Sequence, residues 1–231
     1  MFWGYININP NERIEKPKVR NKEVECYSPE EVEQLLLALK EESLKYQAII
    51  MLALDSGARR SELTGLTWDD IDFEKGIIKI NKTSQYTKER GIFEKKTKTP
   101  TSDRVLYITT ATIRILKKYQ LEQLEKTILF GSKWGKSKRV FTSEDGHDMH
   151  PDTPSQIFEK IIKKHGLRKI KFHALRHTSI SLLIQKGIQP QIISRRAGHS
   201  SVITTDTIYS HIFENEARES AKVLDDIMAI R

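Results

Sequence analysis

The chain has 231 residues, of which 39 are Lys or Arg and 31 are Asp or Glu, so its formal net charge is +8 at pH 7. A chain of this length can bury a core without disulfides, and its single cysteine, Cys26, excludes an intrachain one. The sequence has no apolar run long enough to cross a membrane, and its start lacks the basic and apolar stretches of a signal peptide. We therefore expect a cytosolic globular protein in a reducing compartment, with no membrane partner.

Basic residues gather in three segments of the chain. Residues 79–104 contain eight Lys or Arg and three acids, a local charge of +5. Residues 160–176 contain seven basic residues and no acid, and residues 132–139 add four more basic residues. Clusters of this kind suit a phosphate-binding surface. The net charge by itself fits ordinary solubility equally well.

Residues 1–27 are polar and show no regular hydrophobic period, so they are expected to form an arm or linker. A helix start follows, because Ser28 can cap a helix, Pro29 suits its first position and Glu31 completes a capping box. Two more helices are predicted over residues 45–55, where Gly57 ends the helix, and over residues 60–66.

The pattern then changes from helical to extended. Two β-branched, alternating segments, 76–80 and 104–108, flank a polar stretch rich in Lys. They predict three short antiparallel strands in one small sheet. Helical patterns return over residues 110–125, 154–165, 173–187, 189–197 and 215–230. The expected fold class is therefore mainly α with a small antiparallel β-sheet, an α+β arrangement.

The first candidate for chemistry is the sequence His173-Ala174-Leu175-Arg176-His177. A helix brings residues three apart to one face, and a guanidinium next to an imidazole suits a phosphate whose charge grows in a transition state. Two other interpretations stay open. His173 and His177 have the spacing of zinc-binding helices, although Ala174 replaces the Glu of the zinc protease motif. The pair also fits the polar surface of a packed helix.

Arg59 is the second candidate. It follows Gly57, which is expected to end a helix, and so lies at a junction where functional residues are often held. Glu62, three residues later, is placed to orient a basic partner. Taken alone, this pattern is more often a surface arginine beside a helix start.

Three further residues carry only a weak signal by themselves. Tyr209 lies ten residues after the turn at His199, and a phenol with a pKa of about 10 needs nearby cations or a base to act as a nucleophile. Lys98 lies in a stretch expected to form a hairpin tip, where a lysine usually faces solvent. Arg59, Arg176 and His173 are the candidates to activate Tyr209.

Together these segments resemble the tyrosine recombinase family of the phage integrase type. Residues 57–72 resemble its first-arginine box, and residues 173–178 resemble its His-x-x-Arg box. Residues 198–211 resemble its closing box, with the nucleophilic tyrosine, and residues 97–104 resemble the hairpin that carries its catalytic lysine. The four boxes occur in the family's order and spacing from Ser28 to the end of the chain.

The resemblance implies the catalytic-domain fold of tyrosine recombinases, and it implies a role for each candidate residue. Arg59 and Arg176 hold the scissile phosphate, Tyr209 attacks it, and Lys98 protonates the leaving oxygen. His173 assists proton transfer, and His199 hydrogen-bonds the phosphate. Neither a metal nor another cofactor is expected, since fixed cations replace a metal. Arg60 competes with Arg59 for its role, and Lys95 and Lys96 compete with Lys98.

The resemblance also implies domains and partners. Residues 1–27 are expected to be a linker and the end of a core-binding domain that the chain lacks, residues 28–213 the catalytic domain, and residues 214–231 a helical tail. The expected partners are double-stranded DNA and other copies of the chain, assembled on DNA as a tetrameric synapse. Two alternatives remain, a relaxing enzyme like type IB topoisomerases and a DNA-binding module without turnover.

Overall fold

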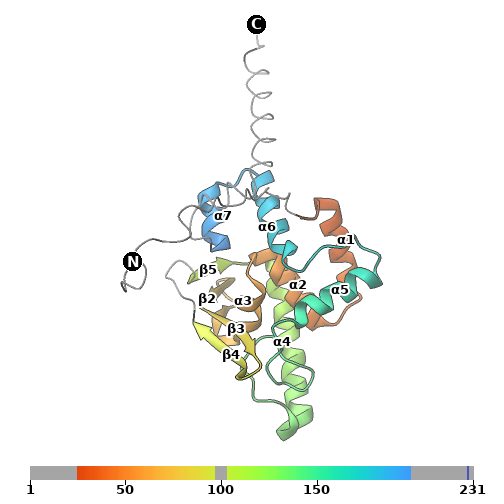
Figure 1. The fold of residues 1–231 in the computed structure, drawn as a ribbon, viewed down its shortest axis with the longest axis vertical. Helices are drawn as coiled ribbons and strands as arrows, with labels where there is room; N and C mark the ends of the chain where they lie inside the picture. Colours follow the sequence, from red (N-terminus) through yellow and green to blue (C-terminus); the bar gives the residue numbers. More distant parts are fainter. Residues whose placement is uncertain (1–24, 97–102, 199–227, 229–231) are drawn as a thin grey trace, which may run out of the picture.

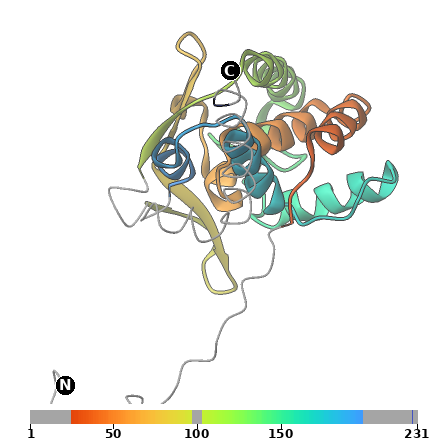
Figure 2. The same cartoon turned by 90° about the horizontal axis from the view of Figure 1, so that it is seen from above.

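The computed structural model of the chain describes residues 25–96, 103–198 and 228. Its elements in chain order are α1 (Pro29–Leu39), α2 (Leu44–Ser56), α3 (Arg60–Gly65), η1 (Trp68–Asp70), β1 (Ile71–Asp72), β2 (Ile77–Ile80), β3 (Lys82–Thr87), β4 (Gly91–Lys96), β5 (Arg104–Tyr107), α4 (Thr110–Phe130), η2 (Gly131–Lys133), α5 (Thr153–Lys164), α6 (Ala174–Gln185) and α7 (Pro190–Ala197). The strands lie on one side of the described domain, and α1 and α5 lie on the other (Figures 1 and 2).

The first helix begins as its sequence predicts. The Ser28 hydroxyl accepts the N–H of Glu31, and the Glu31 carboxylate accepts the N–H of Ser28 at 2.7 Å, so the capping box is complete. The second helix ends at Gly57, whose left-handed conformation (φ +62°) is one that glycine adopts without strain. Both predicted helix ends are therefore confirmed.

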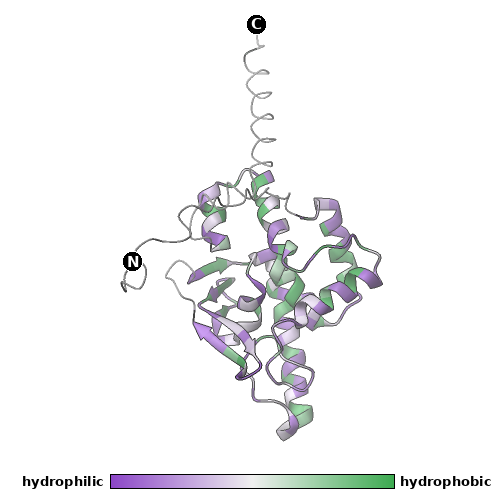
Figure 3. Cartoon of the chain, viewed as in Figure 1, coloured by the Kyte–Doolittle hydropathy of each residue, from purple (hydrophilic) through white to green (hydrophobic). Residues whose placement is uncertain are grey.

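Helix α2 is the centre of the core. It packs against α1, α3, α4, α5 and α6, and its residues Ile49, Ile50 and Leu52 are fully buried. Figure 3 shows apolar residues along this helix, in the middle of the molecule. Because the helix is held on several sides, the segment that follows Gly57 starts from a fixed position.

The strands differ from the predicted single sheet of three strands. In the described residues, five strands form two antiparallel sheets, a three-stranded one in the order β1-β2-β5 and a separate hairpin of β3 and β4. In the hairpin strand β3 only Ser84 is buried, so no alternating apolar face marks it in the sequence. The strand is held instead against α3, where a Cβ on Gly65 would lie 2.9 Å from the Ser84 backbone nitrogen.

The β3–β4 hairpin does not include Lys98. Its turn is formed by residues 88–90, between β3 and β4. Lys98 follows β4 in the sequence, within residues 97–102, which lie outside the described residues. The expected place of Lys98 at a hairpin tip therefore stays a prediction.

Two helices have other bounds than predicted. Helix α4 continues past residue 125 to Phe130, and its last turns leave the core, with Ile128 and Leu129 at least 75% exposed. Helix α6 begins at Ala174, so His173 precedes the helix and is not part of it. Residues 215–227 of the predicted tail helix lie outside the described residues.

The chain is fastened to the domain where it enters α1. The N–H of Tyr27 donates to the Thr178 hydroxyl at 3.0 Å, and the Tyr27 hydroxyl donates to the Arg168 carbonyl at 2.6 Å. The Arg168 guanidinium lies over the Tyr27 ring, pairs with Glu31 and donates to the Cys26 carbonyl. The segment before α1 is thus attached to α6.

Across the part of the chain that the structure describes, no helix is both long and apolar enough to span a membrane.

Candidate active site

The junction between α2 and α3 places Arg59. The Ser56 hydroxyl accepts the N–H of Ala58 at 3.1 Å and fixes the turn after Gly57. Arg59 then takes an extended conformation and caps α3. Its side chain is 41% exposed, so its guanidinium is available to a ligand.

Glu62 orients Arg59 through two hydrogen bonds. One carboxylate oxygen accepts the backbone N–H of Arg59 at 2.8 Å, and the other accepts from its Nη1 at 3.1 Å. Glu62 is only 2% exposed. The suggestion that this carboxylate orients a basic partner is consistent with these contacts.

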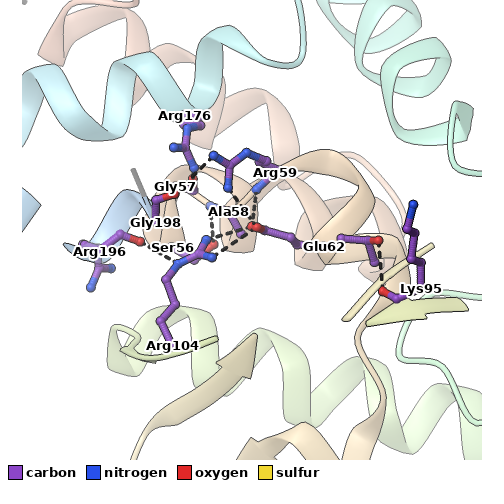
Figure 4. A network of polar contacts seen from close by, with 11 residues as sticks. Ser56, Gly57, Ala58, Arg59, Glu62, Lys95, Arg104, Arg176, Arg196 and Gly198 are labelled. Carbon is purple, nitrogen blue, oxygen red and sulfur yellow. Dashed lines mark hydrogen bonds and ion pairs between the residues drawn. The ribbon is translucent and has the colours of Figure 1, made fainter. Parts of the chain in front are cut away.

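Arg176 reaches the same junction from α6. It is buried, and its Nη1 donates to the Gly57 carbonyl at 2.7 Å. In Figure 4 the Arg59 and Arg176 side chains both lie at the turn around Gly57 and Ala58. Two residues that stand 117 positions apart in the sequence are thereby brought to one place in the fold.

His173 lies beside the two arginines. With Arg59, Arg60 and Phe172 it lines a cavity of about 370 Å³, and Arg176 is not among the described residues that line it. Burial lowers the pKa of His173, and the charges of Arg176, Arg59 and Arg60 lower it further. The imidazole therefore stays neutral to a lower pH than usual and can accept a proton.

The rings of His173 and His177 stand perpendicular, with centroids 4.9 Å apart. Among the described residues no group of three or more His, Cys, Asp or Glu side chains gathers as a metal site would require. The structure therefore gives the zinc interpretation no third ligand within the described part of the chain.

Arg60 and Arg59 have different partners. Arg60 pairs with Asp152 at 2.5 Å and donates to the Ser155 hydroxyl at 2.8 Å. Arg59 instead donates from Nη2 to the Gly198 carbonyl at 3.2 Å. Because Gly198 directly precedes His199 in the sequence, Arg59 touches the start of the closing segment.

Three of the candidate residues, Lys98, His199 and Tyr209, lie outside the described residues. Their chain neighbours are placed. Gly198 lies against Arg59, and Arg104, two residues after the segment that contains Lys98, lies against Glu62. The roles of the three residues stay predictions.

Arg104 lies in the segment that resembles the lysine hairpin, but its contact with Glu62 was not predicted from the sequence. It is buried, and its guanidinium binds both oxygens of Glu62, with Nη2 to Oε2 at 2.7 Å and Nη1 to Oε1 at 3.1 Å. Burial raises the pKa of Glu62, but the hydrogen bonds and charges of Arg104 and Arg59 outweigh this and lower it overall. Glu62 is therefore ionised at neutral pH. Arg104 and Glu62 are 42 residues apart, and no local pattern links them.

Some of the basic residues counted in the sequence are structural. Arg104 and Arg139 are buried, and Arg139 donates to the Thr64 carbonyl at 3.1 Å. Lys82 pairs with Asp70 at 2.8 Å, and Arg168 pairs with Glu31. The three basic segments therefore offer fewer charges to a polyanion than their composition suggests.

The arrangement suits a phosphate. Guanidinium groups stay charged and bind two oxygens at once, and donors fixed before the reaction stabilise negative charge that develops in a transition state. A neutral imidazole next to them supplies a proton acceptor. Two arginines, one neutral histidine and a buried orienting carboxylate form such a site here.

Comparison with known proteins agrees with this chemistry. Residues 26–216 match the phage integrase family. The chain is 32% identical over 229 residues to a XerC-like tyrosine recombinase of Caldanaerobacter subterraneus, covering 94% of this chain and 56% of that protein. It is 29% identical to the ICEBs1 integrase of Bacillus subtilis, covering 96% of this chain and 60% of that protein. The chain thus spans somewhat over half the length of these relatives.

Among solved structures, the Tn1549 transposon integrase in complex with transposon right end DNA has a TM-score of 0.74 to this chain. The identity is 20%, and the match covers 95% of this chain and 71% of that one. This likeness shows that the two chains share a fold.

Proposed function

We propose, because the chain belongs to the phage integrase family of tyrosine recombinases, that it is a site-specific DNA recombinase for DNA integration and recombination. It cleaves and rejoins DNA strands through a 3′-phosphotyrosine intermediate, without metal or ATP. The observation that carries the proposal is the meeting of Arg59, Arg176 and His173 at one junction, with the orienting carboxylate of Glu62 beneath Arg59.

Each candidate residue has one task in this reaction. Arg59 and Arg176 bind the non-bridging oxygens of the scissile phosphate. The Tyr209 oxygen forms a bond to phosphorus while the bond from phosphorus to the 5′-oxygen breaks. His173 takes the tyrosine proton, Lys98 gives a proton to the leaving 5′-oxygen, and the His199 imidazole hydrogen-bonds the phosphate. Attack by a new 5′-hydroxyl reverses these steps and releases Tyr209.

A covalent-trapping experiment tests this function. We expect the protein to form a covalent adduct with a duplex that carries a nick near the cleavage site, because the short cleaved strand diffuses away and prevents rejoining. The adduct is measured as a retarded, protease-sensitive band in a denaturing gel, with EDTA present throughout. The proposal is wrong if no such band forms on DNA that contains the protein's own recombination site, or if the band requires a divalent metal.

We also propose that copies of the chain assemble on double-stranded DNA into a tetrameric synapse through the C-terminal segment. Residues 215–230 carry an apolar stripe at helical spacing that includes Leu224 and Met228, and a stripe of this kind needs a surface to cover it. Met228 is 80% exposed in the single chain. Exposure in the monomer supports a partner copy as the surface that covers the stripe.

Truncation of this tail separates assembly from binding. Deleting residues 215–231 should weaken cooperative binding to a duplex with two recombination sites more than binding to a duplex with one site. Gel-shift titrations of the intact and truncated chains on both duplexes measure the difference. Equal loss on both duplexes would mean that the tail folds back on its own domain.

A further inference from the structure

Four residues of the site form a closed ring of contacts (Figure 4). Arg59 binds Glu62, Glu62 binds Arg104, and Arg104 packs against Gly198. The Gly198 carbonyl then accepts from Nη2 of Arg59 at 3.2 Å and closes the ring. The ring joins α3, β5 and the end of α7, which belong to distant parts of the sequence.

Arg104 hydrogen-bonds both to Glu62 of α3 and to the backbone of α7. Two of its guanidinium nitrogens bind the two oxygens of Glu62, and its Nε donates to the Arg196 carbonyl at 2.9 Å, near the end of α7. A guanidinium can do this because its donors lie in one rigid plane, whereas an ammonium is a single point of charge. Arg104 is 8% exposed, so it is shielded from solvent.

The contact with Gly198 is close. A Cβ at Gly198 would lie 2.8 Å from Nη1 of Arg104 and 3.0 Å from its Cζ. The Arg104 side chain could not move aside without losing the Glu62 carboxylate. The glycine therefore lets the backbone lie directly on the guanidinium plane.

The position of Arg104 in the chain adds to its significance. It is the first residue of β5, directly after Asp103, and the segment that contains Lys98 ends at residue 102. The residues that it contacts, Arg196 and Gly198, stand three positions and one position before His199. Through Glu62 it also reaches Arg59. Arg104 therefore contacts Glu62 and Gly198, and in the sequence it stands close to the segment that contains Lys98.

We propose that Arg104 is a positioning residue of the active site: it fixes Glu62, and hence the direction of Arg59, relative to Gly198 at the end of α7. This inference rests on the proposed recombinase function and adds a residue to it. Arg104 acts through Glu62 and Gly198 and does not itself bind the phosphate. Misplacing a group of the site by about 1 Å can cost on the order of 10²-fold in rate.

The main test is Arg104→Lys, which keeps the positive charge beside Glu62 and removes the planar fork. We expect cleavage of the nicked duplex to slow about 10²-fold, while DNA affinity stays within about twofold. The same assay is repeated with a methylphosphonate at the scissile position, where a methyl group replaces one charged oxygen. A neutral phosphorus centre depends less on the arginine clamp, so the ratio of wild-type to variant rate should shrink on this substrate.

A change of substrate distinguishes positioning from stability. If Arg104 only holds the fold together, the variant loses the same factor on both substrates, and the proposal is overturned. Cleavage by Arg104→Lys at the wild-type rate on ordinary DNA overturns it as well. An absence of any adduct with the wild-type protein would instead contradict the recombinase function itself, so the two failures are distinguishable.

A matched pair of glycine variants keeps the test valid if Arg104→Lys does not fold. Gly198→Ala pushes a Cβ into the Arg104 guanidinium, whereas Gly187→Ala, at the same kind of backbone position (φ +70°), meets nothing within 4 Å. Both variants carry the same backbone strain. We expect Gly198→Ala to cleave ordinary DNA at least tenfold more slowly than Gly187→Ala does. The ratio of the wild-type rate to the Gly198→Ala rate should again be smaller on the methylphosphonate substrate. Equal rates for the two variants would overturn the proposal.

Discussion

Tyr209→Phe should form no covalent adduct with DNA and should still bind it. The substitution removes only the phenolic oxygen, so the proposed nucleophile is lost while the size of the side chain hardly changes. Because attack on phosphorus needs a nucleophile held in line with the leaving oxygen, we expect the loss to be complete within the sensitivity of the gel. The adduct on a nicked duplex and the affinity by gel shift are the two measurements.

A second tyrosine variant is the control for Tyr209→Phe. Tyr107 is 72% exposed, and its backbone carbonyl accepts from the Arg196 guanidinium, a contact that the substitution keeps. Tyr107→Phe should therefore form the adduct at the wild-type rate. An adduct that persists in Tyr209→Phe would show that another residue is the nucleophile.

Arg59→Ala and Arg176→Ala should each slow cleavage by on the order of 10²–10³, the usual loss when one donor to a developing oxyanion is removed. DNA affinity should change little, because one phosphate contributes modestly among the many that a duplex offers. Single-turnover cleavage of the nicked duplex measures the rate, and gel shift measures the affinity.

Arg60→Ala is the matched control for these two variants. Arg60 neighbours Arg59 in the chain, but it pairs with Asp152 and Ser155 rather than with Glu62 and Gly198. We expect a much milder loss of rate for this variant. Thermal unfolding of Arg176→Ala should also be recorded, since Arg176 is buried and its loss removes the donor to the Gly57 carbonyl. A cleavage rate near wild type in Arg59→Ala or Arg176→Ala would remove that arginine from the site.

The helices could be predicted from the sequence because their signals are local. Ser28 and Glu31 predict the start of α1, and Gly57 predicts the end of α2. The two sheets could not be predicted as they are. Strand β3 reads Lys-Thr-Ser-Gln-Tyr-Thr and is held by backbone pairing and by close packing on Gly65, neither of which leaves an alternating pattern.

The same distinction applies to the site. Arg59 and Glu62 lie three residues apart, so a short helix was enough to suggest their contact. The contact of Arg104 with Glu62 and of Arg59 with Gly198 joins residues that are 42 and 139 positions apart. Such contacts depend on how β5 and α7 pack on α3, and only the folded structure shows them.

The hydrogen bond from Tyr27 to Thr178 connects the segment before α1 mechanically to α6. A pull on the chain before residue 25 bears first on the hydrogen bond to Thr178 and on the Arg168 contacts. Thr178 stands two residues after Arg176 on α6, and it also donates to the Ala174 carbonyl at 2.9 Å. Tension on the chain before α1 is therefore transmitted through Tyr27 to α6, the helix that carries Arg176.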